Sequence, residues 1–204
     1  KFYEGYPAPF LMTAVRGERL LTLDKNGTVS LIEIDTGRTL FSYTAYGIKT
    51  VSFARDGNIV AGRNKTQGMQ NSLLLIDPDT GETVAINDDN LVTFALSYDE
   101  TTDRLYSLGF ETRNGRQKTV LKGHSGTTYE RVETLLAYAG EDAGATLALD
   151  EERSRLYTSI GYGTVNILGY EGFTSLEEQN HIPESLMTAG GFLFSLNRDS
   201  SVTV

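Results

Sequence analysis

The sequence predicts an all-β fold built from repeated four-stranded antiparallel units. Apolar runs of about four to eight residues alternate with period two, which is typical of half-buried strands. Turn sequences such as Asn26-Gly27 and Asp77-Pro78-Asp79-Thr80-Gly81 separate these runs. The tail of the chain also repeats its head, since Leu186-Met187-Thr188-Ala189 echoes Leu11-Met12-Thr13-Ala14. Self-similarity at long spacing indicates a repeat architecture.

The first unit shows its elements most clearly. Residues 19–23 and 28–34 form two expected strands around the turn Asp24-Lys25-Asn26-Gly27. Asn-Gly accepts the positive φ that a tight hairpin requires, so this turn predicts an antiparallel pair. The next turn is Asp35-Thr36-Gly37, and residues 38–43 form a third expected strand.

Later units repeat this order and set the period. Their second strands align at Leu20, Ile59, Leu105, Leu156 and Leu193. The intervals of roughly 37 to 51 residues bracket the period of four-stranded propeller blades. We therefore expect residues 1–204 to form a single β-propeller domain, or part of one, with about four to five blades. The expected blade units are 1–45, 46–90, 91–142, 143–181 and an incomplete 182–204.

The last unit stops in the middle of its hairpin at Val204. An unpaired apolar edge invites association, so we expect an incomplete ring within a longer protein. Two alternatives stay open at this point. The strand at residues 1–10 closes the last blade, or two chains associate edge to edge.

The repeated unit resembles a blade of WD-repeat and quinoprotein-like β-propellers. Its best instances are Glu33-Ile34-Asp35-Thr36-Gly37 and the segment 75–81, Leu-Ile-Asp-Pro-Asp-Thr-Gly. The chain has no Trp, so the Trp-Asp signature and the tryptophan docking residues are absent. The resemblance is therefore to a divergent, bacterial-style propeller. It implies a scaffold for protein–protein contacts.

One motif looks out of register. The segment 121–126, Leu-Lys-Gly-His-Ser-Gly, resembles the Gly-His element that opens a WD repeat. That element is expected further downstream, near residues 139–144. We therefore expect residues 123–126 to be a hairpin turn and His124 to be exposed.

Composition excludes several functions. The net charge of −9 without a basic stripe argues against a nucleic-acid partner. The chain lacks Cys and any apolar run long enough to span a membrane. With only His124 and His181 as histidines, no transition-metal site is indicated, and no cofactor is expected. Asp77, Asp79 and Thr80, and separately residues 87–90, could offer oxygen ligands to Ca²⁺, but calcium-loop spacing is not met and turn chemistry is the simpler interpretation.

No catalytic motif is visible. The chain contains no Gly-x-Ser-x-Gly elbow, and its adjacent acids, such as Glu151-Glu152, fall in polar turns. We expect no catalytic residue and no enzymatic activity within these residues. Localisation stays open between the cytoplasm and the periplasm, because the absence of Cys suits either compartment.

Extended hairpins on a rigid scaffold often carry recognition, and the third unit has the longest expected hairpins. The candidate binding residues lie there and in the polar insertion at 64–71: Arg113, Arg116, Tyr129, Arg131, Asn64 and Gln67. Tyr and Arg are residue types favoured at interface hot spots.

The leading expectation is a non-enzymatic protein-interaction scaffold within a longer bacterial protein. One alternative is the regulatory or substrate-recognition propeller of a hydrolase or peptidase whose catalytic domain lies outside this chain. A second is a propeller enzyme with a central-channel site completed by further blades. Fold alone does not choose between these functions.

Overall fold

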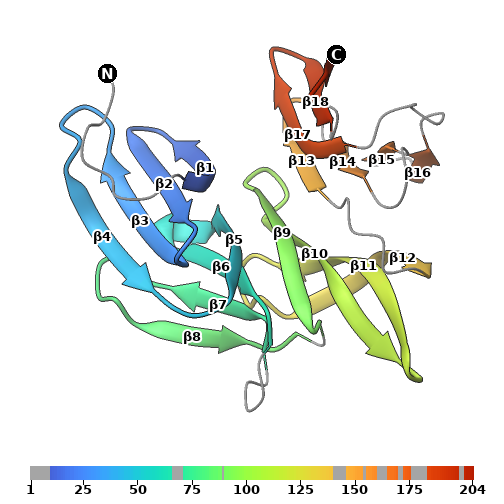
Figure 1. Ribbon diagram of the computed structural model, residues 1–204, viewed down its shortest axis with the longest axis horizontal. Helices are drawn as coiled ribbons and strands as arrows, with labels where there is room; N and C mark the ends of the chain where they lie inside the picture. The colour runs from blue at the N-terminus through green and yellow to red at the C-terminus, as the bar shows by residue number, and fades with distance from the viewer. Residues whose placement is uncertain are drawn as a thin grey trace. The chain divides into compact units, whose positions relative to one another are not determined.

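The computed structural model describes residues 10–65, 71–88, 90–139, 146–153, 155–159, 165–169, 172–175, 183–197 and 200–204 (Figure 1). The chain divides into two compact units, Lys1–Leu96 and Ser97–Val204. The described elements are β-strands apart from η1, a short 3-10 helix at Arg55–Gly57. Among these residues no helix has the length and apolar composition that crossing a bilayer requires.

The first unit contains two four-stranded antiparallel sheets in which consecutive strands are neighbours (Figure 1). The first sheet comprises β1 (Phe10–Arg16), β2 (Arg19–Asp24), β3 (Thr28–Glu33) and β4 (Thr39–Thr44); the second comprises β5 (Ile48–Phe53), β6 (Ile59–Arg63), β7 (Leu73–Ile76) and β8 (Thr83–Ile86). At the β2–β3 turn, Gly27 has a φ of 80° and the Asp24 carboxylate accepts the N–H of Asn26 at 2.8 Å. The Asn-Gly hairpin is thus confirmed.

Apolar side chains from these two sheets pack together as one core. Period-two alternation places them on one face of each strand. The core residues that are buried are Leu21, Leu23, Val29, Leu31, Ile48, Val51, Phe53, Ile59, Ala61, Leu74 and Ile76. Met12 and Ala14 of β1 pack against this core at its margin. The first copy of the repeated Leu-Met-Thr-Ala element, at residues 11–14, therefore contributes to sheet-on-sheet packing.

The third sheet has the order β12-β11-β10-β9. Its strands are β9 (Val92–Asp99), β10 (Arg104–Arg113), β11 (Arg116–Ser125) and β12 (Arg131–Ala139). Strand β9 begins in the first unit and ends in the second. Strands β10 and β11 have ten residues each, whereas no described strand outside this sheet exceeds seven.

The remaining sheets belong to the second unit. The fourth comprises β13 (Thr146–Asp150), β14 (Arg155–Ser159), β15 (Val165–Gly169) and β16 (Gly172–Ser175); the fifth comprises β17 (Pro183–Ala189), β18 (Phe192–Asn197) and β19 (Val202–Thr203). Leu186 and Leu193 of the fifth sheet pack against Ala148, Tyr157 and Val165 of the fourth. The Thr188 hydroxyl also donates to the carbonyl oxygen of Leu149 at 2.6 Å.

The predicted all-β class and the four-stranded antiparallel units are confirmed. Four described sheets have four strands in chain order, and the fifth has three within the described residues. The sheets lie within the residue ranges 10–44, 48–86, 92–139, 146–175 and 183–203.

One prediction is wrong. Residues 123–125 are not a hairpin turn but the end of β11, and His124 is fully buried rather than exposed. The turn instead follows Ser125, whose N–H donates to Glu130 and whose carbonyl oxygen accepts the N–H of Tyr129. The glycines serve close packing: a Cβ on Gly126 would lie 2.8 Å from the carbonyl oxygen of Asp103.

Candidate functional site

The β10–β11 hairpin extends beyond its neighbouring strand. Arg113 pairs with Arg116 across the two-residue loop Asn114-Gly115, where φ is 54° and 72°. Positive φ at both loop residues matches the right-handed twist of paired strands. Within the described residues, the pairing of β12 with β11 ends where Ala139 pairs with Lys118. Residues 112–117 therefore project past the β11–β12 pairing (Figure 1).

This projecting tip is open to solvent. Thr112, Asn114, Gly115, Arg116 and Gln117 are exposed. The backbone is held by the β10–β11 ladder, so the tip presents polar groups on a fixed scaffold. Such a feature is suited to contact with a partner.

The base of the hairpin is fixed by buried polar contacts. The Ser107 hydroxyl lies 2.8 Å from Nε2 of His124, and both residues are fully buried. Lys122, also fully buried, pairs with Glu111 at 3.6 Å. At the surface, Arg104 on β10 forms an ion pair with Glu133 on β12, and these two side chains are partly open to solvent. These contacts position the three strands from which the tip projects.

The structure separates the predicted binding residues of the third sheet. Arg113 and Arg116 flank the tip, and Arg116 is exposed. Arg131 is exposed too, but it pairs with His124, eight residues further along β11. At about 3.3 Å per residue, that is roughly 26 Å from Arg116 along the strand.

Tyr129 does not contribute an exposed aromatic surface. Its side chain is only 8% exposed. Its φ of 57° places it at the end of the β11–β12 turn, where its N–H donates to Ser125 at 2.8 Å. Burial of this ring indicates a packing role at that turn.

The other two predicted binding residues belong to the first unit. Asn64 is half-buried and forms an isolated β-bridge with Val92. Its N–H donates to the carbonyl oxygen of Gly47 at 2.9 Å. Gln67 lies outside the described residues.

Residues 87–90, one of the two possible calcium loops, lie beside a buried polar network. The Asp88 carboxylate accepts the Ser72 hydroxyl at 3.1 Å and the N–H of Asn90 at 3.2 Å. The Ser72 and Thr93 hydroxyls are 2.9 Å apart. Lys65 donates its ammonium to the carbonyl oxygen of Asp88 at 2.7 Å. These oxygens are used within the protein, where they link the starts of β7 and β9.

The other possible calcium loop is a turn. Asp77 accepts the N–H of Asp79 at 2.8 Å and that of Thr80 at 3.3 Å. The pKa of Asp77 lies below its ordinary value of 3.8, chiefly because its carboxylate accepts the hydrogen bond from the Asp79 N–H. In a second turn, the hydrogen bond that the Arg153 guanidinium donates to the Asp150 carboxylate raises the pKa of Arg153. No group of three or more metal-ligating side chains occurs in the part of the chain that the structure describes.

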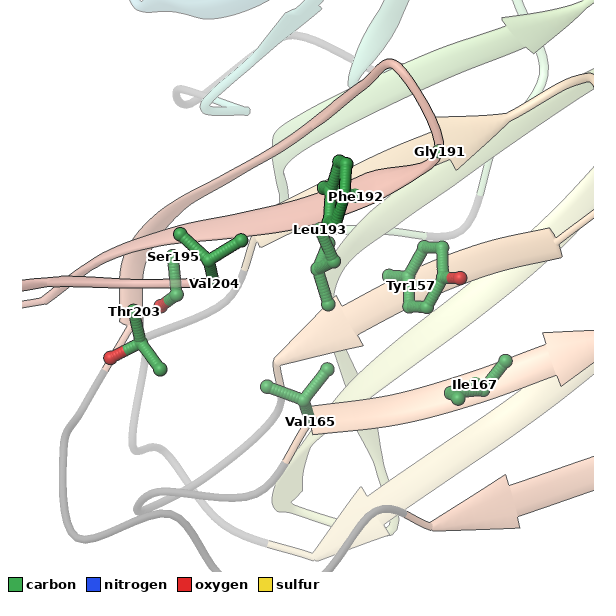
Figure 2. A pocket seen from close by; sticks show the side chains of 9 residues that line it. All are labelled: Tyr157, Val165, Ile167, Gly191, Phe192, Leu193, Ser195, Thr203 and Val204. Carbon is green, nitrogen blue, oxygen red and sulfur yellow. The ribbon is translucent and has the colours of Figure 1, made fainter.

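A cleft of about 320 Å³ lies between the fourth and fifth sheets (Figure 2). Tyr157 of β14 and Val165 and Ile167 of β15 line one side. The other lining residues come from β18, its preceding turn and the end of the chain: Gly191, Phe192, Leu193, Ser195, Thr203 and Val204. Figure 2 shows Leu193 extending from β18 toward the fourth sheet.

Most of the lining side chains are apolar, but the surface of the cleft is divided almost evenly between polar and apolar atoms. Tyr157 is the single ionisable side chain among the lining residues. The sequence alone does not indicate this cleft. Period-two alternation can place Val165 and Ile167 on one face, but it cannot show that residues 192–204 return to that face.

Comparisons with known proteins establish the fold and not a family. No protein-family model and no curated protein matches the sequence. A chain in the crystal structure of the mitotic checkpoint complex matches 98% of this chain at 14% identity, with a TM-score of 0.73. The computationally designed Ika8 protein matches 98% at 13% identity, with a TM-score of 0.58, and 71% of its chain is covered.

These likenesses define the class of fold: the chain has a β-propeller fold. The fold agrees with the order of the four-stranded antiparallel sheets described above. The chain spans 62% of the length of the mitotic-checkpoint chain, less than two thirds.

Proposed function

We propose that this chain is a non-enzymatic protein-interaction module that binds its partner with the tip of the β10–β11 hairpin. The observation that carries the proposal is the exposed tip, residues 112–117, held beyond the end of β12 by a ten-residue ladder. A preformed tip costs little ordering entropy on binding. The structural neighbour from a protein complex supports the same class of function.

We propose Arg116 as the central contact of the hairpin tip. Arg131, at the start of β12, is a second proposed contact at the other end of the same sheet. Both side chains are exposed cations on a chain of net charge −9. Arg can form bidentate hydrogen bonds with carboxylates and stack on aromatic rings. A partner surface with acidic and aromatic side chains would match this chemistry.

The test compares two doubly substituted chains as affinity baits, followed by binding measurements with the purified captured protein. Arg116→Glu/Arg131→Glu reverses the two proposed contacts. Lys25→Glu/Lys49→Glu makes the same change in charge at two exposed residues of the first unit. We expect the arginine variant to raise Kd by about tenfold or more and the lysine control to leave it within about twofold.

If the arginine variant and the lysine control weakened partner binding equally, the cause would be the change in net charge. That result would contradict a binding site at the hairpin. A further part of the proposal is that the module works within a longer bacterial protein, as the sequence resemblance implies. The full reading frame tests this part. A hydrolase or peptidase domain in that frame would favour the alternative role in substrate recognition.

A further inference from the structure

The chain contains two Asn-Gly pairs, and a basic residue precedes each of them. They are Lys25-Asn26-Gly27 between β2 and β3, and Arg113-Asn114-Gly115 at the tip of the β10–β11 hairpin. Asparagine is a thermolabile residue type, and glycine, which has no side chain, lets its backbone nitrogen approach the preceding asparagine amide. Because the two local sequences are similar, a difference in reactivity between the pairs must come from the fold.

Hydrogen bonds hold the first pair in its turn. The Gly27 N–H donates to the carbonyl oxygen of Asp24 at 3.1 Å, and the Gly27 carbonyl oxygen accepts the N–H of Ala45 at 3.3 Å. The Asp24 carboxylate accepts the backbone N–H of Asn26 at 2.8 Å and the side-chain amide of Asn26 at 3.5 Å. The glycine nitrogen and the asparagine amide are therefore both engaged.

The second pair has fewer restraints. Asn114 and Gly115 are exposed, and a Cβ added to Gly115 would meet nothing within 4 Å. Among the described residues, the Asn114 side chain and the Gly115 N–H take part in no hydrogen bond. Asn114 also has a φ of 54°, in the left-handed region that is costly for L-residues. Local opening of this loop therefore costs less free energy than opening of the turn at Asn26.

We propose that Asn114 is a site of spontaneous deamidation in the folded protein. When the loop opens, the Gly115 nitrogen attacks Cγ of Asn114 and a succinimide ring forms. The Cγ–Nδ2 bond breaks, and the amide group leaves as ammonia with the proton that the Gly115 nitrogen releases. Water then opens the ring at either of its carbonyl groups, which yields aspartate or isoaspartate.

Both products change the hairpin tip, residues 112–117. The neutral amide of Asn114 becomes a carboxylate two residues from Arg116. Isoaspartate also adds a backbone atom to a loop whose positive φ values match the twist of the paired strands. We expect the converted chain to bind an acidic partner surface more weakly. This consequence rests on the proposed function, whereas the deamidation itself does not.

Peptide mapping by mass spectrometry tests the proposal on the 204-residue chain, incubated at mildly alkaline pH. Conversion at positions 26 and 114 is followed over time in the folded chain and in guanidinium chloride. We expect similar rates for the two pairs in the denatured chain. In the folded chain we expect Asn114 to convert at least about tenfold faster than Asn26, because opening the Asn26 turn breaks additional hydrogen bonds.

Asp24→Ala is a second test, because it removes the carboxylate that holds Asn26. We expect this variant to convert faster at Asn26 and at an unchanged rate at Asn114. An unchanged rate at Asn26 would contradict the protection assigned to these hydrogen bonds.

The unsubstituted chain decides the proposal even if Asp24→Ala fails to fold. Equal rates at the two pairs in the folded chain, or a faster rate at Asn26, would overturn it. An Asn114 that stays intact while the denatured chain converts both pairs would overturn it too. These measurements need no partner, so their failure would leave the proposed binding function of the tip untouched.

Discussion

At the scale of single residues, His124 and Ser107 form a buried polar pair between β11 and β10. Their side-chain atoms lie 2.8 Å apart, and neither residue is reached by solvent. Buried polar groups are costly when a hydrogen-bond partner is removed. This pair therefore stabilises the base of the hairpin that presents the proposed binding tip.

We expect Ser107→Ala to lower the free energy of unfolding by about 1–3 kcal/mol, because it removes this contact from a buried imidazole. Urea unfolding measures the change. Ser185→Ala, at an exposed position on β17, is the control and should stay within about 0.5 kcal/mol of the unsubstituted chain. A similarly small change for Ser107→Ala would show that the contact does not stabilise the sheet.

Residue composition alone misplaced His124. Gly123-His124-Ser125-Gly126 has the composition of a turn, and this composition predicts an exposed histidine. In the structure Gly123 has a different role: a Cβ on it would lie 3.2 Å from the Glu133 side chain. Close approach of another strand is a tertiary property, and a single sequence does not reveal it.

At the scale of elements, the turn from Asp77 to Gly81 joins β7 to β8 through local chemistry. Asp77 accepts two backbone N–H groups, and Gly81 has a φ of 76°. Both roles follow from residue type, so this turn was predictable. The same holds for the strands, whose alternation appears directly in the sequence.

The Asp77 turn also has a pH dependence with a definite sign. Its folded pKa lies below the ordinary value of 3.8, chiefly because of the Asp79 N–H. The stabilisation from this carboxylate is therefore present above pH 3.8 and is lost as the pH falls through the folded pKa. We expect Asp77→Ala to lower the urea midpoint at pH 7 and to differ less from the unsubstituted chain below pH 3.8.

Asp79→Ala is the matched control, because it keeps the backbone N–H that Asp77 accepts. It should change the urea midpoint less than Asp77→Ala at pH 7. A difference for Asp77→Ala that stayed constant from pH 7 down through the folded pKa would contradict the assigned role of the carboxylate.

The candidate site was predictable only as a region. The length of the strands around Arg113 and Arg116 indicated an extended hairpin, and the structure places these residues at its tip. It places Tyr129 in the protein interior and Arg131 at the start of β12, opposite His124 near the far end of β11. Register decides these positions, and register depends on how each strand pairs with its neighbours.

At the scale of the whole molecule, repetition accounts for both the covered and the uncovered surfaces. Met12 and Ala14 of the first Leu-Met-Thr-Ala element pack against the core of the first unit, whereas the corresponding Met187 and Ala189 are exposed in the second unit. Sequence repetition predicted the sheets, but it did not show which of their faces meet another sheet.

Hydrogen–deuterium exchange of the chain, free and bound to its purified captured partner, tests the central claim most directly. The tip residues 112–117 project past the β11–β12 pairing and are paired on one side only, so their amides should exchange faster in the free chain than those of the three-stranded part of the sheet. We expect binding to slow exchange at this tip more than anywhere else in the described residues. Unchanged exchange at the tip, with protection confined to other strands, would contradict the proposal.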